Sequence, residues 1–231
     1  MDNTFKIFLY IHILSGATAF IAAPVAMMVL KGGNRHRRFG KLFFWSMTGV
    51  CSSGFVMSVL HPNIFLFMIS GFSYYFVASG YRWVFRKRVQ SVKDVEPLDW
   101  VLVVAAGVFN LALLGFGGYA IVKNPANAFG YIAGVFGIIG VRFVIQNVKQ
   151  FYNPPPKNAW LLNHIGGMVG GYVATVSAFS AVNFTFLPSI IQWLWPTIIG
   201  VPLLFAWINY YRRKIFKEGK EVSELVAEIR Y

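Results

Sequence analysis

The stretch Leu162–Asn183, with the sequence LNHIGGMVGGYVATVSAFSAVN, is long enough to cross a membrane and contains small residues almost throughout. A membrane-spanning helix needs about 20 apolar residues. At about 100° per residue, His164 and Met168 share one side of this helix. Gly166 and Gly170 lie roughly opposite. Because small residues let helix backbones approach closely, we expect this span to be the hub of a bundle, with the small residues of the first span as its nearest neighbour.

The composition indicates an integral membrane protein. Of the 231 residues, 57% are hydrophobic and 13% are charged, whereas soluble domains are about 25% charged. The single cysteine, Cys51, excludes an intramolecular disulfide. The first apolar segment lacks a basic leader and is too long for the core of a signal peptide, so we interpret it as a retained span. We expect one membrane domain over residues 1–217 and a short amphipathic cytoplasmic tail over 218–231.

Seven apolar segments are long enough to be membrane spans. They cover residues 5–30, 42–60, 62–85, 99–122, 127–149, 159–183 and 188–211. Of the 21 lysines and arginines, 18 lie in the joints after the first, third and fifth segments or follow the seventh. The positive-inside rule then places the N-terminus outside and the C-terminus in the cytoplasm. The expected fold is an all-α seven-transmembrane-helix bundle. Its expected partners are the lipid bilayer and anionic lipid head groups, not nucleic acid.

The positions of the acidic residues disfavour several kinds of chemistry. None of the eight aspartates and glutamates lies clearly within a span. Ion-coupled pumps and transporters usually place such groups inside the membrane, so a carboxylate-driven proton relay or a paired-carboxylate hydrolase is disfavoured. The sequence also lacks a cysteine pair, an HExxH motif and a glycine-rich phosphate loop. The four histidines remain as candidates.

The histidines form two potential pairs of cofactor ligands. His12 and His61 fall in the predicted outer half of the membrane, whereas His36 and His164 fall near the cytoplasmic side. A b-type haem needs two axial imidazoles that face each other at equal depth. This distribution is compatible with one or two molecules of haem b. Arg142, within the fifth span, is a candidate partner of a haem propionate.

Each of these residues also has a purely structural interpretation. His61 precedes a proline and suits the membrane interface, and His36 in its arginine-rich turn suits a solvated position. His12 and His164 are functional candidates because they lie inside spans, yet each could simply bond to a neighbouring helix. Arg142 could extend to the interface. His12 and His164 are also candidate metal ligands, although their expected depths differ by about 10 Å or more, which disfavours one shared ion.

Two motifs of this chain resemble those of a bacterial family of multi-span membrane proteins of unknown function. The first joins His12, in the first span, to the turn HRRFGK at residues 36–41 and the run FFWSM at residues 43–47. The second is HIGGMVGGYVATVSAF at residues 164–179. The resemblance covers most of the chain and implies a multi-pass protein of the bacterial inner membrane. It implies no activity, so the haem hypothesis rests on the histidines themselves.

Three functions of different classes are compatible with these features, and whether the protein is an enzyme stays open. The first is a b-type haem-binding protein that takes part in redox reactions or electron transfer. The second is a carrier of small molecules or lipids, with its cavity between the small faces of the first and sixth spans. The third is a non-catalytic membrane interaction subunit that docks through its basic loops and tail.

Overall fold

The protein is built from long α-helices. A computed structural model describes residues 3–87, 89, 91–156 and 158–218. Within these ranges there are seven long helices, one short 3-10 turn (Val92–Asp94) and no β-strand. The helices are α1 (Asn3–Met28), α2 (Asn34–Leu60), α3 (Ile64–Arg82), α4 (Pro97–Lys123), α5 (Ala128–Tyr152), α6 (Ala159–Asn183) and α7 (Ser189–Phe216). Each is long and apolar enough to cross a membrane, which confirms the expected seven-helix fold and is consistent with a multi-pass membrane protein.

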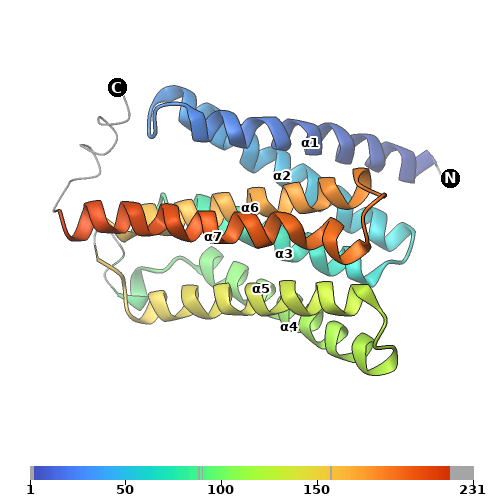
Figure 1. Cartoon of the computed structure of the whole chain (residues 1–231). Helices are drawn as coiled ribbons and strands as arrows, with labels where there is room; N and C mark the ends of the chain where they lie inside the picture. Colours follow the sequence, from blue (N-terminus) through green and yellow to red (C-terminus); the bar gives the residue numbers. More distant parts are fainter. Residues whose placement is uncertain (1–2, 88, 90, 157, 219–231) are drawn as a thin grey trace.

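Successive helices run in opposite directions and form three hairpins around a central helix (Figure 1). The hairpins are α1–α2, α4–α5 and α6–α7, and α3 packs against α2, α4 and α6. Of the most apolar 18-residue stretch of α3, 61% is buried, compared with 22% in α6. The expectation that the sixth span is the hub is therefore wrong. Helix α3 is the hub because its aromatic side chains, among them Phe72 and Phe76, fill the main core.

Helix α6 uses its small residues to pack against α3 and α7. A Cβ atom on Gly80 of α3 would lie 2.6 Å from the backbone nitrogen of Met168, so the two backbones are in direct contact. On another face of α6, Val173 lies against Gly200 of α7. Helix α1 packs mainly on α2 and touches α6 only lightly. The first span is thus not the principal neighbour of the sixth, contrary to expectation.

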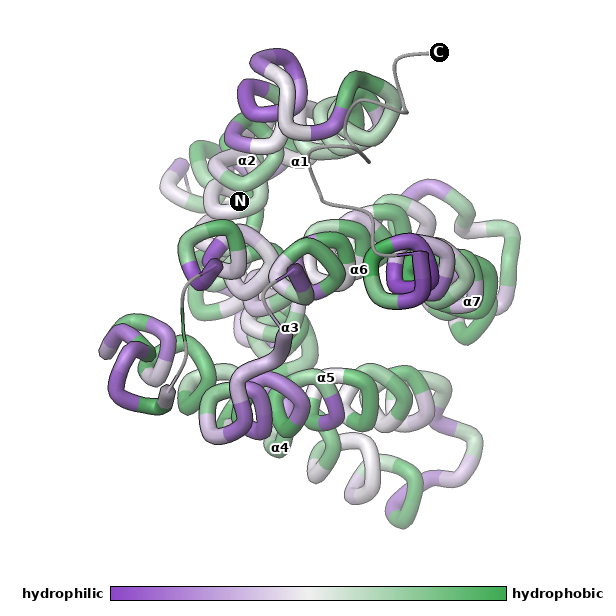
Figure 2. Tube along the Cα trace, turned by 90° about the vertical axis from the view of Figure 1, so that its left-hand side faces the viewer, coloured by the Kyte–Doolittle hydropathy of each residue, from purple (hydrophilic) through white to green (hydrophobic). Residues whose placement is uncertain are grey.

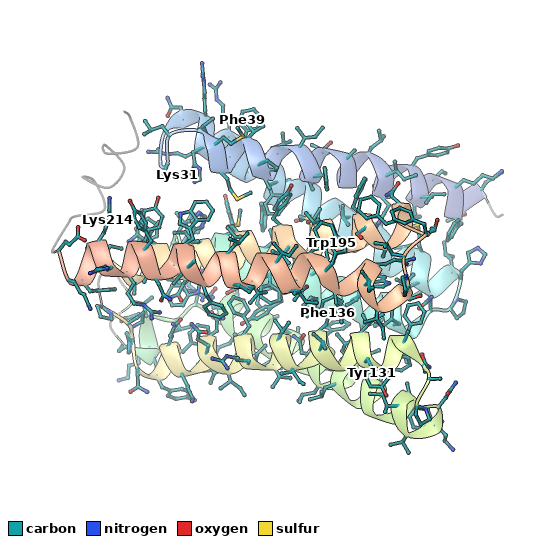
Figure 3. All side chains as sticks on the ribbon, in the orientation of Figure 1. Lys31, Phe39, Tyr131, Phe136, Trp195 and Lys214 are labelled. Carbon is teal, nitrogen blue, oxygen red and sulfur yellow. The ribbon has the colours of Figure 1, made fainter. Side chains whose placement is uncertain are left out.

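The basic residues gather at one end of the bundle, here called the basic end. It comprises the end of α1, the start of α2 and the corresponding ends of the other helices. Figure 2 looks onto this end and shows hydrophilic segments there, with hydrophobic residues along the helices. Figure 3 shows Lys31, in the α1–α2 turn, and Lys214, near the end of α7, at this same end. The alternation of basic joints along the sequence therefore corresponds to an uneven distribution of charge in the bundle, with most lysines and arginines at one end.

Two segments near the basic end differ from their expected form. Helix α2 begins at Asn34, eight residues before the expected span, so the whole motif HRRFGK, expected to be a turn, is helical. Arginine and lysine are good helix formers, so a helix can continue beyond its apolar part. The turn between α1 and α2 is confined to a few residues around Gly32, whose φ of 74° favours glycine. Of the expected amphipathic tail, only Glu218 is among the described residues.

Candidate functional site

Two of the candidate histidines meet at the basic end. His36 lies in the first turn of α2, and His164 lies in the second turn of α6. Their ring centroids are 6.2 Å apart and the ring planes make an angle of 74°. Helices α2 and α6 otherwise pack little against each other. The structure thus brings together one of the two histidine pairs expected from the sequence. Further along the helices, Oγ1 of Thr175 donates a hydrogen bond to Sδ of Met47 at 3.2 Å, which also links α6 to α2.

Both rings of this histidine pair are held in the same way. Nδ1 of His36 donates a hydrogen bond to the carbonyl oxygen of Ala26, and Nδ1 of His164 donates one to that of Gly80, each at 2.9 Å. A carbonyl oxygen can only accept, so Nδ1 carries the proton and Nε2 of the neutral ring carries a free lone pair. No described residue forms a hydrogen bond with either Nε2. Metal-binding histidines are typically oriented by this kind of bond.

Two lysines flank the histidine pair. The ammonium group of Lys31 lies 5.9 Å from the ring centroid of Trp207, and that of Lys87 lies 4.2 Å from the ring centroid of Trp160. Lys31 also donates a hydrogen bond to the carbonyl oxygen of Met27. Partial burial lowers the pKa of Lys31 below its ordinary value. The surroundings of the pair are therefore basic and aromatic, which suits a flat ligand with negatively charged groups.

The other candidate pair, His12 and His61, is not brought together. Nδ1 of His12 lies 3.0 Å from the carbonyl oxygen of Val50 and 3.1 Å from Oγ of Ser53. His61 follows Ser53 by eight residues, which is about 12 Å along a helix. Its ring instead packs edge-on against Phe5, with centroids 4.4 Å apart. The two imidazoles therefore lie at different depths.

His12 and His164, the candidate metal ligands, are also far apart. His12 precedes the basic end of α1 by 16 residues, or about 24 Å, whereas His164 is five residues, or about 7.5 Å, from the basic end of α6. The two side chains cannot share one ion at these depths. Across the described parts of the chain, no group of three or more His, Cys, Asp or Glu side chains could hold a metal.

Arg142 lies on the outer surface of α5, away from the histidines. It is exposed and shares a stripe with the exposed side chains of Ile138 and Ile145. Helix α5 packs against α4 and, to a smaller extent, against α3 and α7. The structure therefore does not place Arg142 beside the histidine pair, and extension of its side chain toward the membrane interface stays a prediction.

A buried ion-pair network near the same end was missed in the sequence. Asp99, in the first turn of α4, is almost fully buried. It accepts hydrogen bonds from Nε of Arg82 at 2.7 Å and from Nη2 of Arg82 at 3.1 Å, and it forms an ion pair with Arg86. The signal available in the sequence was an acidic residue at the start of an apolar segment, two residues after Pro97. Its arginine partners could not be assigned without the fold.

A cavity of about 350 Å³ lies beside this network, between the ends of α3 and α5 and the start of α6. Its lining includes Trp83, Arg86, Lys87, Gln150, Trp160 and the prolines 154–156. Lys87 and Trp160 thus lie between the cavity and the histidine pair, because Trp160 precedes His164 by one helical turn.

Comparison of the chain with protein-family models, with curated proteins and with solved structures finds no match. The resemblance to a bacterial membrane protein family stays a prediction. The class of protein that the fold supports is a multi-pass, all-helical membrane protein. Any function must be argued from the sites themselves.

Proposed function

We propose that this chain is a b-type haem-binding membrane protein that transfers single electrons, with His36 and His164 as axial ligands. The observation that carries the proposal is the spacing of the two rings. A metal–imidazole bond is about 2.0 Å long and the ring centre lies about 1.1 Å further on, so two rings on opposite sides of one iron have centroids about 6.3 Å apart. The observed separation is 6.2 Å.

The number of ligands favours haem over a lone metal ion. Zinc sites use three or four protein ligands, whereas a haem already supplies four nitrogens and needs only two axial residues from the protein. The site offers two histidines, and the described chain provides no cluster of three metal-ligating side chains. A bis-histidine haem is the metal centre that fits this ligand set.

The surroundings of the pair support the same proposal. The carbonyl oxygens of Ala26 and Gly80 hold Nδ1 of each ring and leave Nε2 free to bind iron. Lys31 provides a positive charge for a propionate. A bound haem would supply one-electron chemistry between ferric and ferrous iron.

Absorption spectroscopy of the purified protein tests this proposal. The full chain is expressed with ample haem supply, purified in detergent and compared with His36→Ala and His164→Ala. The wild type is expected to show a Soret band that each substitution abolishes. His61→Ala is the matched control, because His61 packs on Phe5 away from the site and should leave the band unchanged. A colourless wild type, or a band retained by both site variants, would contradict the proposal.

A further inference from the structure

The cavity at the basic end has the size and lining of a small-molecule site. Its volume of about 350 Å³ is at the lower end of the range for such sites, about 300–1,000 Å³. Trp160 and the prolines 154–156 provide apolar surface that is at least partly exposed, Trp83 lies buried behind it, and Arg86 and Lys87 provide positive charge. No carboxylate is among the described residues that line it. This lining is complementary to an anion with an apolar body.

Arg86 is incompletely satisfied by the protein. It is only 6% exposed, and its guanidinium lies between the ring of Trp83, with the centroid at 5.0 Å, and the ring of Phe151, at 4.8 Å. Its Nη2 pairs with Asp99, but Nε and Nη1 have no acceptor among the described residues. An unsatisfied buried donor costs about 1–3 kcal/mol, more when charged. Because both atoms are themselves buried, a ligand in the cavity does not reach them, and Arg86 contributes positive charge to the cavity wall.

The charge balance around the cavity is positive. Asp99 is shared between Arg82 and Arg86, so one buried carboxylate faces two guanidinium groups. The other acid of the network, Glu96, bonds to Arg82 but is 62% exposed and therefore screened by solvent. Lys87 has no carboxylate within ion-pair distance among the described residues and instead lies over the ring of Trp160.

We propose that this cavity binds a small organic anion with a planar aromatic body, with its carboxylate held by Lys87 beside the positive charge of Arg86 and its ring packed on Trp160. Trp160, which is partly exposed, favours a flat ring over inorganic phosphate, because a bare anion would leave its open face uncovered. The volume is too small for the two acyl chains of a phospholipid. The proposal is independent of haem binding at His36 and His164.

Anthranilate and its neutral amide, 2-aminobenzamide, are a matched pair of fluorescent probes for this site. Both are titrated into the full-length protein in detergent, and binding is followed through probe fluorescence and energy transfer from tryptophan. Anthranilate should bind saturably, and the amide at least about tenfold more weakly, because it lacks the charge that a charge-assisted hydrogen bond requires. Equal binding of the two probes, or no saturable binding of anthranilate, would overturn the proposal.

Variants locate the binding and separate it from folding. Lys87→Gln and Trp160→Ala should each weaken anthranilate binding about tenfold or more while the protein stays folded, since Lys87 is exposed and Trp160 is partly exposed. Lys93→Gln is the matched control, because Lys93 is an exposed lysine of the same loop outside the cavity, and it should bind like the wild type. Unchanged binding in Lys87→Gln would overturn the assignment.

Competition distinguishes other anions. Inorganic phosphate should displace anthranilate only weakly, and phosphatidylglycerol added to the micelles should not displace it at low mole fraction. Benzoate, a non-fluorescent aromatic carboxylate, should displace anthranilate. If phosphate displaced anthranilate as effectively as benzoate does, the aromatic part of the proposal would be overturned. Displacement by phosphatidylglycerol would assign the cavity to a lipid head group instead. The spectrum of bound haem should be the same in Lys93→Gln and Trp160→Ala. A loss of anthranilate binding therefore bears only on the cavity proposal, and the absence of a haem spectrum in the wild type bears only on the haem proposal.

Discussion

The carbonyl oxygen of Gly80 accepts a hydrogen bond from Nδ1 of His164 at 2.9 Å, beside the closest contact between α3 and α6. In that contact Gly80 lies against Gly167, where neither residue has room for a Cβ atom. The orientation of the imidazole therefore depends on the distance between the two helices. The central packing contact and the candidate haem ligand belong to one structural unit.

Replacing Gly167 with alanine is expected to destabilise this unit. The added Cβ would meet the backbone of Gly80 and force α3 and α6 apart. Overpacking of a close contact costs about 1–3 kcal/mol, so the midpoint of unfolding in detergent should fall. The hydrogen bond from His164 to Gly80 should weaken as well. Gly115→Ala, on the open surface of α4, is the control and should not lower the midpoint. Equal stability of the two variants would show that the contact is looser than described.

The ion-pair network should respond very differently to its two acids. Asp99→Asn leaves the guanidinium groups of Arg82 and Arg86 without their buried carboxylate, and loss of one partner of a buried pair costs about 3–5 kcal/mol. Glu96→Gln removes an exposed acid and should cost about 0–1 kcal/mol. Urea unfolding of the purified variants measures both effects. Similar losses for the two variants would contradict the description of Asp99 as the centre of the network.

A third prediction concerns Asn147, which holds Trp83 in the wall of the cavity. Its Oδ1 accepts hydrogen bonds from Nε1 of Trp83 at 3.0 Å and from Oγ of Ser79 at 3.1 Å. Asn147→Leu leaves both donors buried without an acceptor and should lower the free energy of unfolding by about 1–3 kcal/mol for each.

The neighbouring residue offers a matched control for this change. Gln146 is exposed on the same helix, and Gln146→Leu should be close to neutral in stability. Thermal unfolding and the emission of Trp83, followed as the difference from a Trp83→Phe background, report the effect. A larger loss in Gln146→Leu than in Asn147→Leu would be incompatible with the proposed bonds.

The sequence was sufficient to predict the class of fold. Seven apolar stretches and the alternation of basic joints predict seven helices with one basic end, because the length and charge of each span are local properties. The centre of the bundle was not predictable in the same way. The small residues of Leu162–Asn183 do mark a close contact, but the hub is α3, whose aromatic residues contact helices on several sides. Which faces meet is a property of the whole bundle.

The candidate site was predictable only in part. The depth of His36 and His164 followed from their positions near the ends of two spans, and the structure brings them together. The pairing of His12 with His61 failed geometrically, since His12 bonds to α2 about two turns away from His61. The cavity lined by Trp83, Arg86 and Trp160 was not predictable, because its walls come from three segments with no shared motif.

The proposed bis-histidine ligation is tested most directly by electron paramagnetic resonance of the ferric, haem-loaded protein. With His36 and His164 as axial ligands, the wild type should give a low-spin spectrum with about one haem per chain. His36→Ala and His164→Ala should each give a high-spin spectrum or lose the haem, whereas His12→Ala should keep the low-spin signal. A low-spin signal that survives both site substitutions, or that only His12→Ala removes, would contradict the assignment of this histidine pair as the haem ligands.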